Sequence, residues 1–133
     1  MTPASPVIVV VAAVVEQDGR LLVTRRLPDT HLGGLWEFPG GKCDPGETHE
    51  AGLRRELMEE LGVDAVVGEE LLATEHAYPE RTVRLHFRRC TIAGTPEARL
   101  GQQIRWVARR DLRTLEFPAA DAALIAVLAG SPA

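Results

Sequence analysis

The chain has 133 residues, of which 45% are hydrophobic and 26% are charged, and its formal net charge is -4 at pH 7. This balance is typical of a folded globular protein, and we expect residues 1–133 to form a single domain. The acidic charge argues against a protein that binds DNA or RNA polymers, because such binding usually depends on a basic face. A small anionic ligand is compatible with this charge if metal ions lie between the ligand and the protein.

The first apolar segment covers residues 7–15. It is far too short to span a bilayer, no basic stretch precedes it and no credible cleavage site follows it. We therefore expect a buried strand, no membrane contact and a cytoplasmic protein. Cys43 and Cys90 are the only cysteines, and we expect both to be reduced thiols.

Turn signals divide the next part of the chain into short elements. Asp18-Gly19 predicts a hairpin that leads into a second strand at residues 21–23. A loop is expected at residues 25–34, followed by a short strand at 36–38 that ends in a turn at 39–41.

From residue 48 the pattern becomes helical. Thr48 is a suitable N-cap, and Gly62 is well placed to end a helix over residues 48–61. Further strands are expected at residues 66–67, 71–75, 83–89 and 104–107. A second helix is expected over residues 119–128, with core candidates Leu124, Val127 and Leu128. These elements predict an α+β fold in which helices flank a mixed sheet.

Glutamates gather on one face of the first predicted helix. On a helical wheel of ~100° per residue, Glu56, Glu59 and Glu60 fall within an arc of about 100°. Like charges at this spacing cost roughly 0.2–0.5 kcal/mol per pair. The apolar residues expected to face the core from the other side are Ala51, Leu57, Met58 and Leu61.

Two interpretations fit this cluster: a solvated acidic face or a site for divalent cations. The second is favoured because no lysine relieves the carboxylates, Arg55 lies beside them, and Gly40-Gly41 before the helix offer backbone carbonyls. Oxygen ligands in this number suit Mg²⁺, with Mn²⁺ as a substitute, and ligation would turn the repulsion into attraction.

The spacing of these residues resembles the signature of the Nudix hydrolase family. The signature fixes nine positions over 23 residues, which here are Gly41, Glu47, Arg55, Glu56, Leu57, Glu59, Glu60, Gly62 and Val63. The resemblance implies the Nudix fold, an α/β/α sandwich in which the signature forms a loop-helix-loop motif. Segments 21–26, 35–42 and 117–121 also resemble the MutT-like branch of the family, which hydrolyses nucleoside triphosphates.

The resemblance implies roles for the signature residues. Arg55 would hold Glu56 and Glu47 by ion pairs, and the role of Glu47 would be structural rather than directly catalytic. Glu56 would orient or deprotonate the attacking water. The metal would be held by the Gly40 carbonyl, Glu56, Glu59 and Glu60.

For the substrate, the resemblance implies a nucleoside triphosphate that is hydrolysed to a nucleoside monophosphate and pyrophosphate. Water made more acidic by the metal would attack an inner phosphorus. Arg26 and Lys42 would contact the phosphates, and Arg81 is either a third contact or an exposed loop arginine. Candidates for contact with the base are Trp36, Phe38 and Asp121, of which Phe38 fits the core equally well and Asp121 also fits an early helix turn.

The preferred base is left open by these residues. MutT-like chains that act on 8-oxoguanine usually have Asn at the position of Asp121, and an ionised Asp121 only accepts hydrogen bonds. We favour 8-oxo-dGTP, with CTP or 5-methyl-dCTP as a close competitor. A diphosphate-linked substrate such as ADP-ribose is a further alternative, suggested by Pro79, sixteen residues after Val63.

One departure from the MutT-like pattern concerns catalysis. Leu100 stands where related chains usually have a glutamate, just before Gly101-Gln102, and Glu97 lies three residues away. A further catalytic carboxylate is therefore in doubt. A non-catalytic nucleotide-binding module is the alternative from another class, although such modules usually lose the signature glutamates. Monomer and homodimer are both compatible with the sequence.

Overall fold

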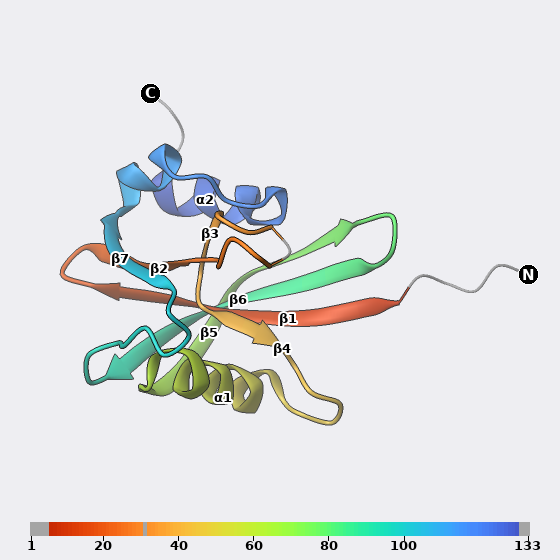
Figure 1. Ribbon diagram of the computed structural model, residues 1–133, viewed down its shortest axis with the longest axis horizontal. Helices are drawn as coiled ribbons and strands as arrows, with labels where there is room; N and C mark the ends of the chain where they lie inside the picture. Colours follow the sequence, from red (N-terminus) through yellow and green to blue (C-terminus); the bar gives the residue numbers. More distant parts are fainter. Residues whose placement is uncertain (1–5, 31, 131–133) are drawn as a thin grey trace, which may run out of the picture.

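The computed structural model describes residues 6–30 and 32–130 (Figure 1). In chain order its elements are β1 (Val7–Gln17), β2 (Arg20–Arg25), β3 (Trp36–Glu37), β4 (Gly40–Lys42), α1 (His49–Leu61), β5 (Asp64–Ala77), β6 (Thr82–Ala93), β7 (Gln103–Ala108), the 3₁₀ helices η1 (Arg109–Thr114) and η2 (Ala119–Asp121), and α2 (Ala122–Ala129).

Strand β1 lies at the centre of a mixed sheet. It pairs in parallel with β6, with Val7 opposite Thr82 and Val15 opposite Cys90. Antiparallel pairing adds β5 beyond β6 and β4 on the other edge of β1. The end of β1 pairs with β2, which also pairs with β3 and β7. Helix α1 covers one side of the sheet and α2 the other, which confirms the predicted α/β/α sandwich (Figure 1).

Two hydrophobic cores lie on opposite sides of β1. Residues 11–15 are all buried, and successive side chains of a strand point to opposite faces. Val11 packs with Leu57 on the α1 side, whereas Val14 packs with Leu124 on the α2 side. A strand that is covered on both faces requires apolar residues throughout, which explains the uninterrupted run in the sequence.

Helix α1 begins and ends where the sequence predicts. Thr48 Oγ1 accepts a hydrogen bond from the N–H of Ala51 at 3.1 Å, and Gly62 ends the helix with a φ of 68°. The connection between β6 and β7 supplies a partner for a free carbonyl at the C-terminal end of the helix, since the Gln102 side chain donates to the Glu60 carbonyl at 3.0 Å.

Several details of the predicted elements are wrong. The strands expected at residues 66–67 and 71–75 are one strand, β5, because two register shifts around Glu70 bend the strand without ending its pairing. The turn expected at 39–41 contains β4, since Gly40 and Gly41 pair with β1. The helix expected from residue 119 begins with η2, and Val127 is 61% exposed rather than in the core.

The buried face of α1 also differs from the prediction. Leu57 and Leu61 are buried as expected, but Met58 is 38% exposed, and Leu53 is fully buried in its place. Ala51 is also exposed. The buried stripe consists of Leu53, Leu57 and Leu61, which are four residues apart. The helix therefore buries a face centred on Leu57, whereas the helical wheel predicted a face turned toward Met58.

Both cysteines are free thiols, and Cys90 is buried in the core on the α1 side. Among residues 6–30 and 32–130, none of the helices is long and apolar enough to cross a membrane.

The rotation of α1 can be tested by truncating two neighbouring side chains. We expect Leu57→Ala to lower the free energy of unfolding by about 2–5 kcal/mol, because this side chain is fully buried against the sheet. Met58→Ala removes a partly exposed side chain and should change it by only about 0.5 kcal/mol. Urea unfolding followed by circular dichroism measures both values, and equal losses would contradict the orientation of α1.

Candidate active site

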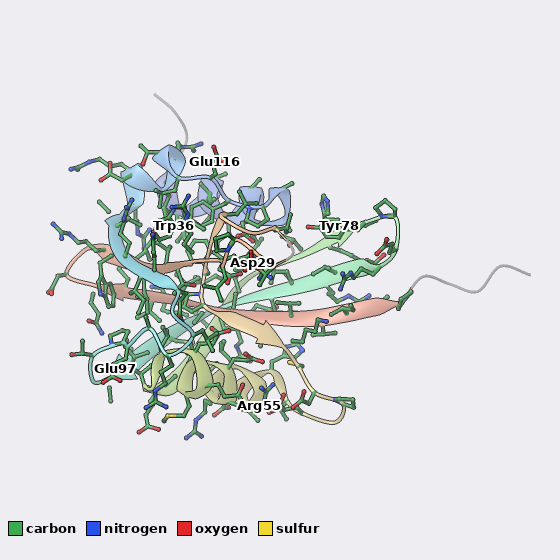
Figure 2. All side chains as sticks on the ribbon, viewed as in Figure 1. Asp29, Trp36, Arg55, Tyr78, Glu97 and Glu116 are labelled. Atoms are coloured by element: carbon green, nitrogen blue, oxygen red, sulfur yellow. The ribbon has the colours of Figure 1, made fainter. Side chains whose placement is uncertain are left out.

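Arg55 connects helix α1 to the loop that precedes it (Figure 2). Its guanidinium group makes a two-pronged contact with Glu47 at 2.8 and 2.9 Å, and it also reaches Glu56 at 3.0 Å and Glu59 at 3.2 Å. The contact with Arg55 lowers the pKa of Glu47 to about 2, helped by a backbone hydrogen bond from Asp44. The same contacts raise the pKa of Arg55, so the Glu47–Arg55 pair is charged at neutral pH.

Two glycines make close contacts possible around β4: Gly41 leaves space for a carboxylate of α1, and Gly40 lies directly against the backbone of β1. A Cβ atom on Gly41 would lie 2.6 Å from the Glu56 carboxylate, and one on Gly40 would lie 2.0 Å from the Val11 carbonyl oxygen. The Gly40 N–H donates a hydrogen bond to the Glu60 carboxylate. Neither position therefore has space for a side chain, and the helix carboxylates and the glycine backbone converge on one point.

Glu60 is partly buried beside two other acidic side chains. Burial, followed by the negative charges of Glu37 and Glu56, raises its pKa to about 8, although the bond from Gly40 acts in the opposite direction. A divalent cation would reverse this balance, because it attracts the carboxylates that now repel each other. The donor set of carboxylate and carbonyl oxygens fits Mg²⁺ or Mn²⁺.

Glu37 belongs to the site, although the sequence did not single it out. It lies in β3 between Trp36 and Phe38, and its carboxylate accepts a hydrogen bond from Arg26 Nη1 at 3.0 Å. Burial raises the pKa of Glu37, against the influence of Arg26. The sequence did offer a signal for Glu37, because a charged residue stands between two buried aromatic residues. Side chains alternate along a strand, so Glu37 points away from the core that contains Trp36 and Phe38.

A cavity of about 430 Å³ extends from Gly40 and Gly41 across the α2 side of the sheet. It brings together most of the predicted substrate contacts, and its lining includes Arg26, Glu37, Phe38, Lys42, Arg81 and Asp121. Arg81 reaches the cavity from the tight turn between β5 and β6, where the N–H of Tyr78 donates to the Arg81 carbonyl at 2.7 Å. Its lining combines the cationic side chains of Arg26, Lys42 and Arg81 with an apolar end around Phe38 and Asp121.

The apolar end is formed by aromatic rings and by Asp121. Phe38 stacks on Phe117 with ring centroids 5.4 Å apart and meets Phe87 edge to face at 6.0 Å. Asp121 is only 5% exposed. Burial, and then the negative charge of Glu37, raises its pKa to about 7. Its carboxyl group can therefore be neutral near physiological pH, when it both donates and accepts hydrogen bonds.

Trp36 does not join these residues. Its ring is 6% exposed and packs in the core on the α2 side, with the guanidinium carbons of Arg25 and Arg105 lying 5.7 and 4.7 Å from the ring centroid. Trp36 does not line the cavity, in contrast to the prediction that it could contact the base.

The loop that carries Leu100 lies at the C-terminal end of α1, where Figure 2 also places Glu97. The N–H of Glu97 donates to the Leu61 carbonyl at 2.9 Å, and Gln102 Oε1 accepts from the N–H of Leu100 at 2.9 Å. The Leu100 side chain is 54% exposed. The loop thus supports the helix end through backbone groups and the Gln102 side chain, which do not depend on a carboxylate at residue 100.

The fold is a mixed sheet between helices, and the candidate site is a loop-helix-loop whose carboxylates meet the glycine backbone of β4. The model of the NUDIX domain matches residues 10–127, and the chain belongs to this family. The match covers all the site residues described above.

Relatives with similar sequences cover nearly the whole chain. It is 37% identical over 131 residues to a CTP pyrophosphohydrolase of Escherichia coli (strain K12), covering 93% of this chain and 96% of the relative. It is 36% identical over 121 residues to an 8-oxo-dGTP diphosphatase of Haemophilus influenzae, covering 90% and 89%.

Solved structures agree with the fold. The solution structure of the E. coli ORF135 protein has a TM-score of 0.82 at 35% identity and covers 93% of this chain and 91% of its own. The crystal structure of a MutT protein from Methanosarcina mazei Go1 has a TM-score of 0.85 at 23% identity, covering 96% of each chain, and supports the fold alone.

The raised pKa of Glu60 predicts how stability depends on pH without metal. A folded-state pKa of about 8, against 4.5 for the ordinary group, means that this group stabilises the fold below about pH 4.5 and that its contribution is lost as pH rises through about 8. We expect thermal unfolding in EDTA to shift to lower temperature across this window, with Asp121 acting in the same direction. Added Mg²⁺ should remove most of the shift.

Glu60→Gln provides the control for this measurement, because it removes the titrating group. The variant should show a smaller loss of stability between about pH 5 and 8 than the unaltered protein. Glu47, with its lowered pKa, acts with the opposite sign and only at lower pH. An identical pH dependence in Glu60→Gln would exclude Glu60 as the source.

Proposed function

We propose that the protein is a Mg²⁺-dependent nucleoside triphosphate pyrophosphohydrolase with a preference for 8-oxo-dGTP. It converts the triphosphate and water to a nucleoside monophosphate and pyrophosphate. The relatives named CTP pyrophosphohydrolase and 8-oxo-dGTP diphosphatase support this reaction. The observation that carries the proposal is the convergence of the Glu56 and Glu60 carboxylates on Gly40 and Gly41, which line the cavity.

The ligands proposed for Mg²⁺ are three carboxylates of α1 and one carbonyl of β4, namely Glu56, Glu59, Glu60 and Gly40. When bound, the ion acidifies the attacking water and offsets charge on the phosphates. The repulsion between Glu56 and Glu60 supports this assignment, because a cation between them relieves it.

Glu56 is the proposed general base. Arg55 binds its Oε1 atom at 3.0 Å and orients the carboxylate, so that Oε2 can accept a proton from the attacking water. Glu47 holds Arg55 from the other side at 2.8 Å and therefore positions the base indirectly. Water then attacks an inner phosphorus in line with pyrophosphate as the leaving group.

Cationic side chains in the cavity would bind the phosphate chain. A triphosphate brings roughly four negative charges, and Arg26, Lys42 and Arg81 lie along the lining to offset them. Arg26 is held at 3.0 Å from Glu37, which fixes its guanidinium group before the ligand arrives.

The base would lie at the apolar end of the cavity, against Phe38 and beside Asp121. Ionised Asp121 pairs best with two adjacent N–H donors, such as those on the Watson–Crick edge of 8-oxoguanine. Neutral Asp121 offers one donor and one acceptor, which match the N4 amine and N3 of cytosine. Its pKa of about 7 makes both forms available, so CTP is the second candidate, in agreement with the name of the 37% identical relative.

Pyrophosphate release from a panel of normal and oxidised nucleotides tests the activity and its source. Glu56→Gln and Glu60→Gln should lower kcat by roughly 10²–10⁴-fold, since one removes the base and the other a metal ligand. Glu60→Gln should also stabilise the metal-free fold, because Glu60 is the acid surrounded by like charges.

Glu50→Gln is the matched control, because Glu50 is exposed in the first turn of the same helix. It should retain near-normal turnover. Release that is unchanged in Glu56→Gln would refute the assigned base. No release by the unaltered protein from any nucleotide would favour the alternative of a non-catalytic binding module.

Asp121 should make base preference depend on pH. Raising the pH from about 6 to 8 ionises it, and the ratio of kcat/KM for 8-oxo-dGTP to that for CTP should rise by at least roughly fivefold, the low end of discrimination by a paired contact. Effects on the shared phosphate chemistry cancel in this ratio. Asp121→Asn cannot ionise, and its ratio should stay constant; a parallel rise in the variant would show that another group reads the base.

A further inference from the structure

A second group of potential metal-binding side chains lies outside the acidic site, which consists of Glu56, Glu59, Glu60 and the Gly40 carbonyl. His49, Glu70 and His86 each present one potential ligand atom, and these atoms lie within 4.8 Å of one another. His86 Nδ1 is 2.6 Å from Glu70 Oε1, and the rings of His49 and His86 have centroids 4.3 Å apart. Three elements, α1, β5 and β6, supply one residue each.

The backbone of β5 brings Glu70 to this position. Register shifts occur between Val67 and Glu70 and between Glu70 and Leu72, so Glu70 pairs with Arg88 while the next pairs are offset. A bulge of this kind redirects a side chain, and here it carries Glu70 to His86, two residues from its direct partner. The irregular strand thus places a carboxylate next to two imidazoles, which is a suitable set of ligands for a metal ion.

The sheet separates this group from the nucleotide cavity. Leu85 and Phe87 line the cavity, and the intervening His86 points to the other face of β6. His49 precedes Glu56 by two helical turns, which is about 10 Å along α1. The two groups also differ in chemistry, because among the described residues the proposed ligands of the acidic site are all oxygen donors.

We propose that His49, Glu70 and His86 bind a divalent transition ion, Zn²⁺ in particular, and fasten the first turn of α1 to strands β5 and β6. Two imidazoles and one carboxylate suit Zn²⁺ far better than Mg²⁺, which prefers oxygen ligands. Three protein ligands leave the fourth tetrahedral position to water.

The group is accessible to ions from solvent. The His86 side chain is 15% exposed and Glu70 is 42% exposed, so an ion can enter from solvent. The positive charge of the neighbouring Arg88 opposes a cation here, and its guanidinium group is held by the Gly68 carbonyl through hydrogen bonds of 2.9 and 2.7 Å.

Titration of the full chain with ZnCl₂ by isothermal calorimetry tests the site, with excess Mg²⁺ present to occupy the acidic site. One Zn²⁺ should bind per chain and raise the unfolding temperature. His49→Ala and His86→Ala should each weaken binding by at least roughly tenfold, since even the outer partners of metal ligands contribute 10–100-fold. Glu70→Gln is a milder variant for use if either alanine variant fails to fold.

Two control variants separate this site from other possible ligands. His76→Ala should bind Zn²⁺ normally, because His76 packs against Tyr78 elsewhere on β5. Glu56→Gln should also bind normally, since it alters only the acidic site. Loss of binding in Glu56→Gln, unchanged binding in the His49 and His86 variants, or no binding to the unaltered protein would each overturn the proposal; in the last case His86 and Glu70 form a hydrogen bond only.

Discussion

The guanidinium group of Arg55 is the interaction on which the acidic site depends. It binds Glu47 before the helix, Glu56 and Glu59 on it, and the carbonyl of Lys42 at the end of β4. Without this cation the carboxylates of α1 would repel one another and the loop beside them. Removing one member of such a network is costly, because it leaves the others as uncompensated charges.

A line of acids crosses the protein from the helix to the far end of the cavity. The charge of Glu37 raises the pKa of Glu60 on one side and of Asp121 on the other. Arg26 binds Glu37 in the middle of this line. Groups at the proposed phosphate and base positions are therefore linked electrostatically through one residue of a two-residue strand.

Much of this architecture could be predicted from the sequence, because it depends on local rules. The caps at Thr48 and Gly62, the buried run of β1 and the spacing of the signature carboxylates are all set by neighbours along the chain. Long-range packing decided the rest. The rotation of α1 that buries Leu53, the bulge at Glu70 and the burial of Trp36 each depend on residues from other elements, which periodicity does not encode.

The closed C-terminal end of α1 has a consequence for its motion. The last turns of helices usually fray, because their carbonyls lack intrahelical partners. Here the Glu60 carbonyl accepts from Arg99 N–H and from Gln102 Nε2, and the Leu61 carbonyl accepts from Glu97 N–H. Amide hydrogen exchange in this turn should therefore follow opening of the β6–β7 connection. A loop that is distant in sequence thus controls how rigidly the helix holds the Glu59 and Glu60 side chains.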